Sequence, residues 1–215
     1  MPTPPAHRAQ SRGARGFRRL SGLDRSGPRP DQTRRGEPLR PFTIPNFVGY
    51  LRLAAIPPYL VIALGSGDGR TAPAALLYLW ITLGDFLDGF LARATGQYSR
   101  MGALLDPVID RLSVLSGIVV CWNFELLPRW GLAIVGAREV AVLLLSELAL
   151  RRGLEIEINW MGRIGALLVF GGLFWTQVID SWITYLMFFA GLATGILATL
   201  IYVRAGRAAA AASAD

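Results

Sequence analysis

The segment Asp85–Asp110, with the sequence DFLDGFLARATGQYSRMGALLDPVID, decides how the chain is organised. Its fixed residues follow the pattern D-x2-D-G-x2-A-R-x8-G-x3-D-x3-D: Asp85, Asp88, Gly89, Ala92, Arg93, Gly102, Asp106 and Asp110. Leu, Phe, Ile and Val dominate both flanks, which are apolar enough to enter a membrane. Because a carboxylate at the centre of a membrane helix costs about 2.5–3.5 kcal/mol on insertion scales, four of them require compensating cations.

The spacing of the four carboxylates indicates how they could act together. Asp85 and Asp88 share one face of a helix, and Asp106 and Asp110 share one face of the next helix. Two such pairs facing each other form an oxygen-rich cage of the kind that Mg²⁺ and Mn²⁺ prefer. A two-metal cage suits displacement at phosphorus, because it stabilises both the attacking and the leaving oxygen.

Three further residues of the pattern suit a phosphorylated ligand. Gly89 and Gly102 present no side chain where a ligand could approach the backbone, and Arg93 offers a planar cationic fork that matches phosphate. A simpler interpretation places the carboxylates at helix ends on a solvated face. The apolar neighbours of the segment disfavour that interpretation.

At every fixed position the pattern resembles the signature of the CDP-alcohol phosphotransferases, membrane enzymes of phospholipid head-group synthesis, and the resemblance covers about residues 43–205. It implies that the protein binds CDP-diacylglycerol with Mg²⁺ or Mn²⁺, as two ions, on the diphosphate. The implied metal ligands are Asp85, Asp88, Asp106 and Asp110. The implied residues for the cytidine diphosphate part are Asp88, Gly89, Ala92, Arg93 and Gly102. Asp110 is the implied catalytic general base.

Composition and length predict a one-domain, all-α integral membrane protein. The chain has 215 residues, of which 53% are hydrophobic. Six apolar segments have the roughly 18–23 residues of a spanning helix: 44–64, 72–94, 104–124, 130–150, 160–179 and 181–203. The fifth and sixth are poorly separated, and we favour two helices over a re-entrant pair. The single cysteine, Cys121, is expected to be a small buried residue.

The distribution of arginine predicts the orientation in the membrane. The links expected outside carry few bases, which are Arg70 and Arg129. The links expected inside carry more bases: Arg93, Arg100, Arg151, Arg152, Arg204 and Arg207. An even number of spans then places both termini in the cytoplasm, in a multi-pass protein of the cell inner (plasma) membrane. The same arrangement gives a cytosol-facing polar active-site cavity between the second and third spans.

The N-terminal region, 1–42, is predicted to be a disordered cytoplasmic tail, because Pro, Gly, Ser and Arg dominate it. Its bases are Arg8, Arg12, Arg15, Arg18, Arg19, Arg25, Arg29, Arg34, Arg35 and Arg40, against the acids Asp24, Asp31 and Glu37. With apolar spans following, attraction to an anionic membrane surface is favoured over nucleic-acid binding. The domain is predicted at 43–205, followed by a flexible tail at 206–215.

The residues before and after the signature bear on the acceptor alcohol. The segment Ile44-Pro45-Asn46, followed by Arg52, resembles the opening of phosphatidylglycerophosphate synthases and of cardiolipin synthases of the same family. Asn46 is interpreted either as a ligand-binding residue or as a helix cap. The charged pair Arg138-Glu139 within a predicted span is a functional-site candidate, with a structural ion pair as the alternative.

Three arginines are expected to converge on an anionic acceptor beside the metals: Arg111, Arg138 and Arg163. The alternative for Arg163 is that it extends to the membrane interface. Glu147 is a candidate partner for Arg151. Small residues are expected to allow close helix packing and to support a homodimer: Gly165, Gly171, Gly172, Gly191 and Gly195.

The resemblance to phosphatidylglycerophosphate synthase makes glycerol 3-phosphate the first-choice acceptor. Phosphatidylglycerol, the acceptor of a cardiolipin synthase, comes second and inositol phosphate third, because Val48-Gly49 and Ile164-Gly165-Ala166 depart from the usual pattern. A cation transporter without chemistry is the remote alternative, and it leaves the fixed Gly, Ala and Arg positions unexplained. The only histidine, His7, lies in the tail, which makes histidine-based catalysis improbable.

Overall fold

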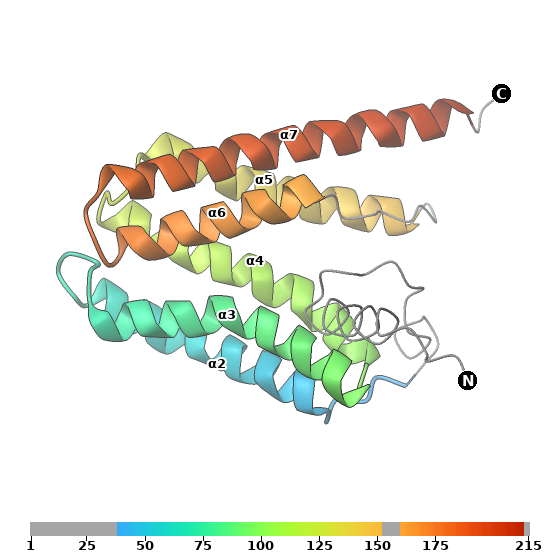
Figure 1. Cartoon of the computed structure of the whole chain (residues 1–215), viewed down its shortest axis with the longest axis horizontal. Coiled ribbons are helices and arrows are strands. Elements are labelled where there is room, and N and C mark those ends of the chain that lie inside the picture. Colours follow the sequence, from blue (N-terminus) through green and yellow to red (C-terminus); the bar gives the residue numbers. More distant parts are fainter. Residues whose placement is uncertain (1–37, 152–159, 213–215) are drawn as a thin grey trace, which may run out of the picture. The chain divides into compact units, whose positions relative to one another are not determined.

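The computed structural model describes residues 38–151 and 160–212, and over these residues the chain is helical without strands. The helices, labelled in Figure 1, are α2 (Ile44–Leu64), α3 (Ala72–Thr95), α4 (Arg100–Asn123), α5 (Arg129–Arg151), α6 (Trp160–Thr176) and α7 (Trp182–Ala212). Each helix falls on one of the predicted apolar segments. The all-α class is therefore confirmed for the described part, and the last two segments form two helices.

Three of these helices are long and apolar enough to cross a membrane: α2, α3 and the Trp182–Ile201 part of α7. The protein is thus a membrane protein by the length and composition of its helices. The other three predicted spans stay predictions. Helix α6 has 17 residues, short of the roughly 20 that a bilayer requires. Helix α4 carries Asp106, Asp110 and Arg111, which reduce its hydropathy.

The chain divides into two compact units, and α2, α3 and α4 contribute to both. The first unit comprises the described residues of Met1–Ala55 together with Trp80–Asp110. The second comprises Ile56–Leu79 and the described residues of Arg111–Asp215. All fixed residues of the acidic signature therefore belong to the first unit. The three arginines predicted to bind the acceptor belong to the second.

The structure describes only the residues of the two predicted tails that adjoin the domain. Residues 1–37 of the predicted tail lie outside the described residues, as does the side chain of Glu147. The carbonyl of Leu39 accepts a hydrogen bond from the Met101 amide, and the carbonyls of Arg40 and Pro41 accept from Asn46, so this stretch is bonded to α2 and α4 within the first unit. Helix α7 continues to Ala212, past the predicted domain limit, while flexibility of 206–215 stays a prediction.

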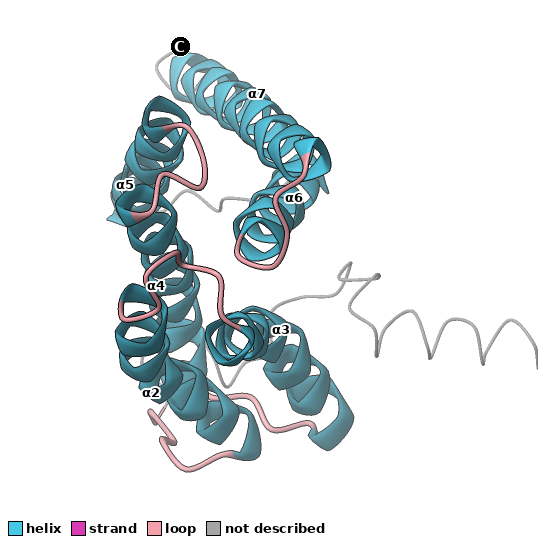
Figure 2. Ribbon diagram, turned by 90° about the vertical axis from the view of Figure 1, so that its left-hand side faces the viewer, coloured by secondary structure: helices cyan, strands magenta, loops and turns pink. Residues whose placement is uncertain are grey.

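Within the second unit, α6 and α7 run antiparallel side by side (Figures 1 and 2). Glycines allow the close approach, because a Cβ on Gly165 would lie 2.9 Å from the Gly195 amide nitrogen, and one on Gly172 would lie 2.8 Å from Phe188 Cα. The predicted packing through small residues is confirmed for this helix pair, and the homodimer stays a prediction. Cys121 is buried, as predicted.

Candidate active site

A buried arginine on α2 organises the acidic signature in the first unit. The Arg52 guanidinium donates through Nη1 to Asp88 Oδ2 at 2.9 Å and through Nη2 to Asp110 Oδ1 at 3.0 Å. Asp85 Oδ1 lies 3.8 Å from Nη1, and Nε donates to the Ile81 carbonyl at 2.9 Å. One cation thereby joins carboxylates from α3 and α4. Arg52 therefore links α3 to α4 through these two carboxylates.

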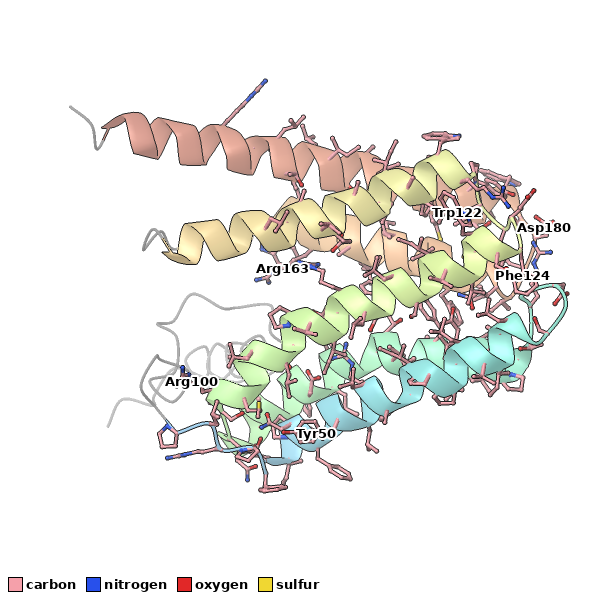
Figure 3. All side chains as sticks on the ribbon, turned by 180° about the vertical axis from the view of Figure 1, so that it is seen from behind. Tyr50, Arg100, Trp122, Phe124, Arg163 and Asp180 are labelled. Carbon is pink, nitrogen blue, oxygen red and sulfur yellow. The ribbon has the colours of Figure 1, made fainter. Side chains whose placement is uncertain are left out.

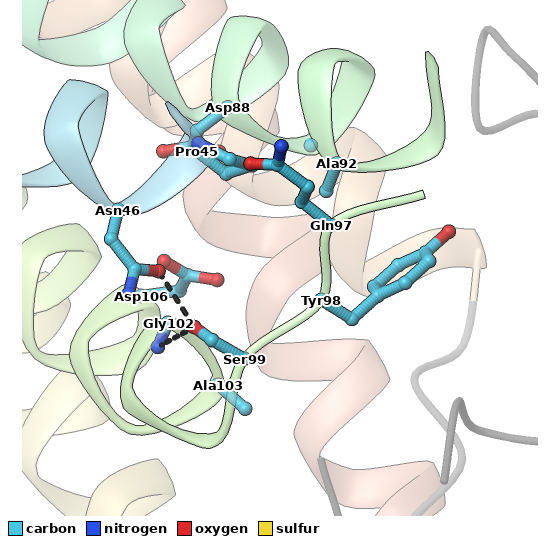
Figure 4. Close-up of a pocket in the computed structure, with 11 residues that line it drawn as sticks. Pro45, Asn46, Asp88, Ala92, Gln97, Tyr98, Ser99, Gly102, Ala103 and Asp106 are labelled. Carbon is cyan, nitrogen blue, oxygen red and sulfur yellow. Dashed lines mark hydrogen bonds between the residues drawn. The ribbon is translucent and has the colours of Figure 1, made fainter. Parts of the chain in front are cut away.

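The four carboxylates differ in exposure. The Asp88 side chain is 7% exposed, whereas those of Asp110 and Asp85 are 34% and 53% exposed. Asp106 lies with Asp88 in the lining of a small cavity, shown in Figure 4. The first unit therefore gathers three of the predicted acids around one arginine, and the fourth, Asp106, lies beside Asp88 in the cavity lining.

The donor set fits a hard divalent cation in kind, since it consists of carboxylate oxygens. In the described part of the chain, however, no three His, Cys, Asp or Glu side chains are arranged to hold a metal ion. The Arg52 guanidinium lies instead among three of the carboxylates. The metal site and its two ions stay a prediction, and ions that bind there would share oxygens with Arg52.

The cavity between the start of α2, the end of α3 and the start of α4 has a volume of about 110 Å³. Its lining includes four of the five residues predicted to hold the cytidine diphosphate part: Asp88, Gly89, Ala92 and Gly102. Ligand pockets usually measure about 300–1,000 Å³, so this cavity has room for only a part of a nucleotide. The rest of such a ligand would extend beyond the cavity.

The fifth predicted residue, Arg93, lies over Gly89 rather than in the cavity lining. A Cβ on Gly89 would be 3.2 Å from Arg93 Nη1. The absence of a side chain at Gly89 therefore makes room for the arginine, and its predicted role toward a ligand stays untested. The combination of a glycine and an arginine four residues later on one helix places the guanidinium against the backbone of α3.

Asn46 forms a polar link across one wall of the cavity. Its Nδ2 donates to the carbonyls of Arg40 and Pro41, and its Oδ1 accepts from Ser99 Oγ at 2.8 Å (Figure 4). The cap of α2 is Thr43, whose Oγ1 accepts from the Asn46 amide. The cap interpretation of Asn46 was therefore wrong, because its side chain bonds the chain before the helix and the loop after α3.

Gly102 is required by this link. A Cβ on Gly102 would lie 2.7 Å from Asn46 Oδ1, and the Gly102 amide donates to Ser99 Oγ at 2.9 Å. The sequence predicted that Gly102 leaves space for a ligand, and the structure shows that the space is taken by Asn46. Gly102 and Asn46 both line the cavity, and the absence of a side chain at Gly102 allows Asn46 to take its place in the cavity wall.

In the second unit the charges are reversed. Glu139 on α5 is 4% exposed and binds two guanidinium groups, those of Arg111 on α4 and Arg138 beside it. The Nε atoms of both arginines are buried without a hydrogen-bond partner among the described residues. Gly195 on α7 leaves space for Arg138, since a Cβ there would lie 3.0 Å from its Nε. The cluster carries one more positive than negative charge.

The structural ion pair that was the alternative for Arg138 and Glu139 is thus present, with Arg111 as a third member. Arg163 lies elsewhere on α6, with its Cζ 5.8 Å from the centre of the Trp160 ring. Figure 3 shows Arg163 well apart from Asp180 and Trp122, which lie toward the other end of the same unit. Convergence of all three arginines on an acceptor stays a prediction.

The sequence interpretation assigned no function to several residues that build the site. Arg52 was noted only as part of a motif, although a charged residue in the middle of an apolar span is itself a signal. Gln97 and Ser99 lie in the link between α3 and α4, where the Gln97 side chain accepts from the Ile44 amide. Polar loop residues of this kind have no sequence signal that separates them from ordinary turn residues.

The fold and the site together define a helical membrane protein with an acidic group of side chains beside a polar cavity. The sequence profile described as CDP-alcohol phosphatidyltransferase matches residues 42–201. The chain belongs to this family, whose members are enzymes.

Curated relatives of two kinds are similar to the chain. The cardiolipin synthase (CMP-forming) of Streptomyces coelicolor is 38% identical over 143 residues, which cover 64% of this chain and 66% of the relative. The CDP-diacylglycerol–glycerol-3-phosphate 3-phosphatidyltransferases of Bacillus subtilis and Shigella flexneri are each 28% identical, over 64% and 78% of this chain and 74% and 96% of their own lengths. The chain thus spans just under two thirds of the Streptomyces relative.

Proposed function

We propose that the protein transfers the phosphatidyl group of CDP-diacylglycerol to a hydroxyl of glycerol 3-phosphate and releases CMP. The observation that carries this proposal is the gathering of Asp88 and Asp106 at one cavity, with Asp110 held beside Asp88 by Arg52. The relatives named as glycerol-3-phosphate phosphatidyltransferases support this acceptor. Membership of the family supports the donor and the type of reaction.

In the proposed reaction Asp110 takes the proton from the acceptor hydroxyl. The hydroxyl oxygen then attacks the phosphorus that carries diacylglycerol, and the bond from that phosphorus to the bridging oxygen of the diphosphate breaks. The bridging oxygen keeps the electron pair and departs with CMP. Arg52 holds one oxygen of Asp110 at 3.0 Å, so the base has a fixed position, which favours proton transfer within hydrogen-bond reach.

Mg²⁺ or Mn²⁺ held by Asp85, Asp88, Asp106 and Asp110 would supply charge neutralisation for the diphosphate and for the departing oxygen. Gly89, Ala92 and Gly102 would border the nucleotide part, because they line the cavity beside Asp88. A transporter of cations would need the acidic group alone. The transporter hypothesis does not account for the cavity or for the membership of an enzyme family.

The acceptor phosphate would be bound by Arg111 and Arg138, whose cluster with Glu139 keeps an excess of positive charge. Arg163 is the third proposed acceptor residue. The same chemistry suits phosphatidylglycerol, which also presents a glycerol hydroxyl beside a phosphate. The 38% identity to a cardiolipin synthase favours this lipid as the second candidate acceptor.

We further propose that the protein lies in the cell inner membrane with both termini in the cytoplasm, as a six-span protein able to form a homodimer. The apolar helices α2, α3 and α7 support the membrane location. The proposed donor is a lipid, and its acyl chains would remain in the bilayer while the diphosphate reaches the acids. Cysteine labelling at added surface positions would test the orientation.

The proposed activity is tested with purified protein in detergent, CDP-diacylglycerol, Mg²⁺ or Mn²⁺, and labelled glycerol 3-phosphate or phosphatidylglycerol in separate reactions. The expected result is CMP release together with labelled phosphatidylglycerophosphate. Labelled cardiolipin instead would assign the second acceptor. An Asp106→Asn variant serves as the matched inactive control, and addition of EDTA should stop the reaction. If CMP is released with neither acceptor, the proposal is rejected.

A further inference from the structure

Arg52 is a buried, fully paired cation of the first unit. It is 1% exposed, and each of its three nitrogens donates a hydrogen bond, to Ile81, Asp88 and Asp110. A buried guanidinium is costly unless it is paired and hydrogen-bonded, and here all three nitrogens are bonded to groups of α3 and α4. These hydrogen bonds fix the position of the Arg52 side chain.

Gly84 on α3 shows that the first unit is shaped around this side chain. A Cβ at Gly84 would lie 2.5 Å from Arg52 Cδ and 2.6 Å from Cγ, which no real side chain allows. The glycine directly precedes Asp85, so the arginine crosses α3 at the first residue of the acidic signature. The arginine on α2 and the glycine on α3 are therefore complementary.

The position of Arg52 conflicts with a divalent ion in one respect. The oxygens that it binds belong to Asp88 and Asp110, which are also proposed ion ligands. A guanidinium within 4 Å of three carboxylates reduces their mutual repulsion, and it also repels a second cation that approaches them. The same side chain would therefore stabilise the site without ions and weaken the binding of ions.

We propose that Arg52 is a positioning residue that acts as an internal counterion, holding Asp88 and Asp110 at their spacing before divalent ions bind and then competing with these ions for the same oxygens. This inference rests on the metal requirement of the proposed function. It separates two properties of arginine, its charge and its forked geometry. Lysine retains the charge without the fork, and glutamine retains neither.

A role limited to joining α2 to α3 and α4 makes a different prediction. If Arg52 only stabilised the fold, its replacement would loosen the carboxylates, and the affinity for ions would fall or stay the same. An internal counterion predicts the opposite sign, because removal of the positive charge makes the carboxylates more attractive to cations. The direction of the change in ion affinity therefore distinguishes the two roles.

The experiment compares wild-type, Arg52→Gln and Arg52→Lys proteins as full chains in detergent. Mn²⁺ binding is measured by the electron paramagnetic resonance of free Mn²⁺, with and without CDP, and the melting temperature is measured in EDTA and in Mn²⁺. We expect Arg52→Gln to melt lower in EDTA yet bind Mn²⁺ about tenfold more tightly. Arg52→Lys should keep an Mn²⁺ affinity within about threefold of wild type and lose turnover, since it cannot bind both carboxylates through a fork.

Gly84→Ala provides a second route that keeps the arginine. The added Cβ displaces the Arg52 side chain from its path, so Mn²⁺ should bind at least about threefold more tightly while the protein in EDTA melts lower. Gly49→Ala is the matched control, because its Cβ would meet only Ile109 Cδ1 at an ordinary 3.5 Å. If Arg52→Gln does not fold, Gly84→Ala decides the question.

Unchanged or weaker Mn²⁺ binding in Arg52→Gln, or in Gly84→Ala where only that variant folds, would overturn the inference. Such a result with normal Mn²⁺ binding by the wild-type protein would leave the proposed function intact. Failure of the wild-type protein to bind Mn²⁺ in the presence of CDP would instead reject the metal site of the proposed function, and the role of Arg52 with it.

Discussion

The two units of the protein contain buried charge clusters of opposite composition. In the first unit one arginine, Arg52, serves three carboxylates, whereas in the second unit one carboxylate, Glu139, serves two arginines. Each cluster is held by a single central residue of the minority charge. Each therefore keeps an excess that a ligand of the opposite sign can neutralise.

Under the proposed function, the two clusters would bind different ligands. An excess of negative charge attracts divalent cations, and an excess of positive charge attracts the phosphate of an acceptor. The minority residue is needed in both clusters, because like charges gathered in an apolar setting repel one another strongly. The predictions that follow test whether the clusters differ in the way their charges indicate.

The largest effect is expected in the first cluster, at Asp110. Replacement by Asn removes the proposed base and should lower CMP release by about 10²–10⁴-fold, while the affinity for CDP stays within a factor of about three. Initial rates and calorimetric titration with CDP measure the two quantities. Asp68→Asn, in the exposed loop after α2, is the matched control. Turnover close to normal would exclude Asp110 as the base.

The next effect is one of stability, in the second cluster. Glu139→Ala leaves two arginines without their shared partner and should reduce the free energy of unfolding by about 3–5 kcal/mol. Glu139→Gln should cost less, since it keeps an oxygen that accepts hydrogen bonds. Denaturant unfolding in detergent provides the measurement. A loss close to zero for Glu139→Gln would show that the charge of Glu139 is unimportant to its cluster.

Arg138→Lys tests whether the second cluster binds the acceptor. Hydrogen bonds to charged groups are worth about 1.5–3 kcal/mol, so loss of the fork should raise the KM for the acceptor about tenfold or more and leave that for CDP-diacylglycerol unchanged. The exposed Arg204→Lys is the matched control. Equal increases in both KM values would contradict the division between the clusters.

The smallest effect is expected for an ion pair outside both clusters. Arg129 and Glu125 are paired at 2.8 Å, but their side chains are 53% and 70% exposed. Arg129→Ala should therefore change the free energy of unfolding by less than about 1 kcal/mol, even with loss of the contact to Trp122. A loss as large as that of Glu139→Ala would mean that burial does not determine how much an ion pair contributes to the stability of this protein.

The sequence predicted the helices well because hydropathy is a local property. The apolar runs at 44–64 and 72–94 became α2 and α3 with at most one residue of change. The acids of the signature were found because four carboxylates in an apolar setting are conspicuous. Arg52 received no assigned function, since nothing local shows that an arginine on one helix will reach acids about 33 to 58 residues further along the chain.

The role of Gly102 shows the same limit from another side. Its position in the pattern indicated that a side chain was excluded there, which was correct. The group that fills the space is Asn46, more than 50 residues earlier, rather than a ligand. Sequence spacing relates residues within a helix turn, but it does not tell which of several distant polar groups will occupy a gap.

The sequence by itself determined the all-helical class, the family and the identity of the acidic residues, because hydropathy, helical period and a fixed motif are all written along the chain. Only the tertiary structure decided which cation lies among the acids and which acid lies between the two arginines of the second unit. The physical reason is that ion pairs between helices depend on how the helices are packed. That packing results from the whole chain and from no segment of it alone.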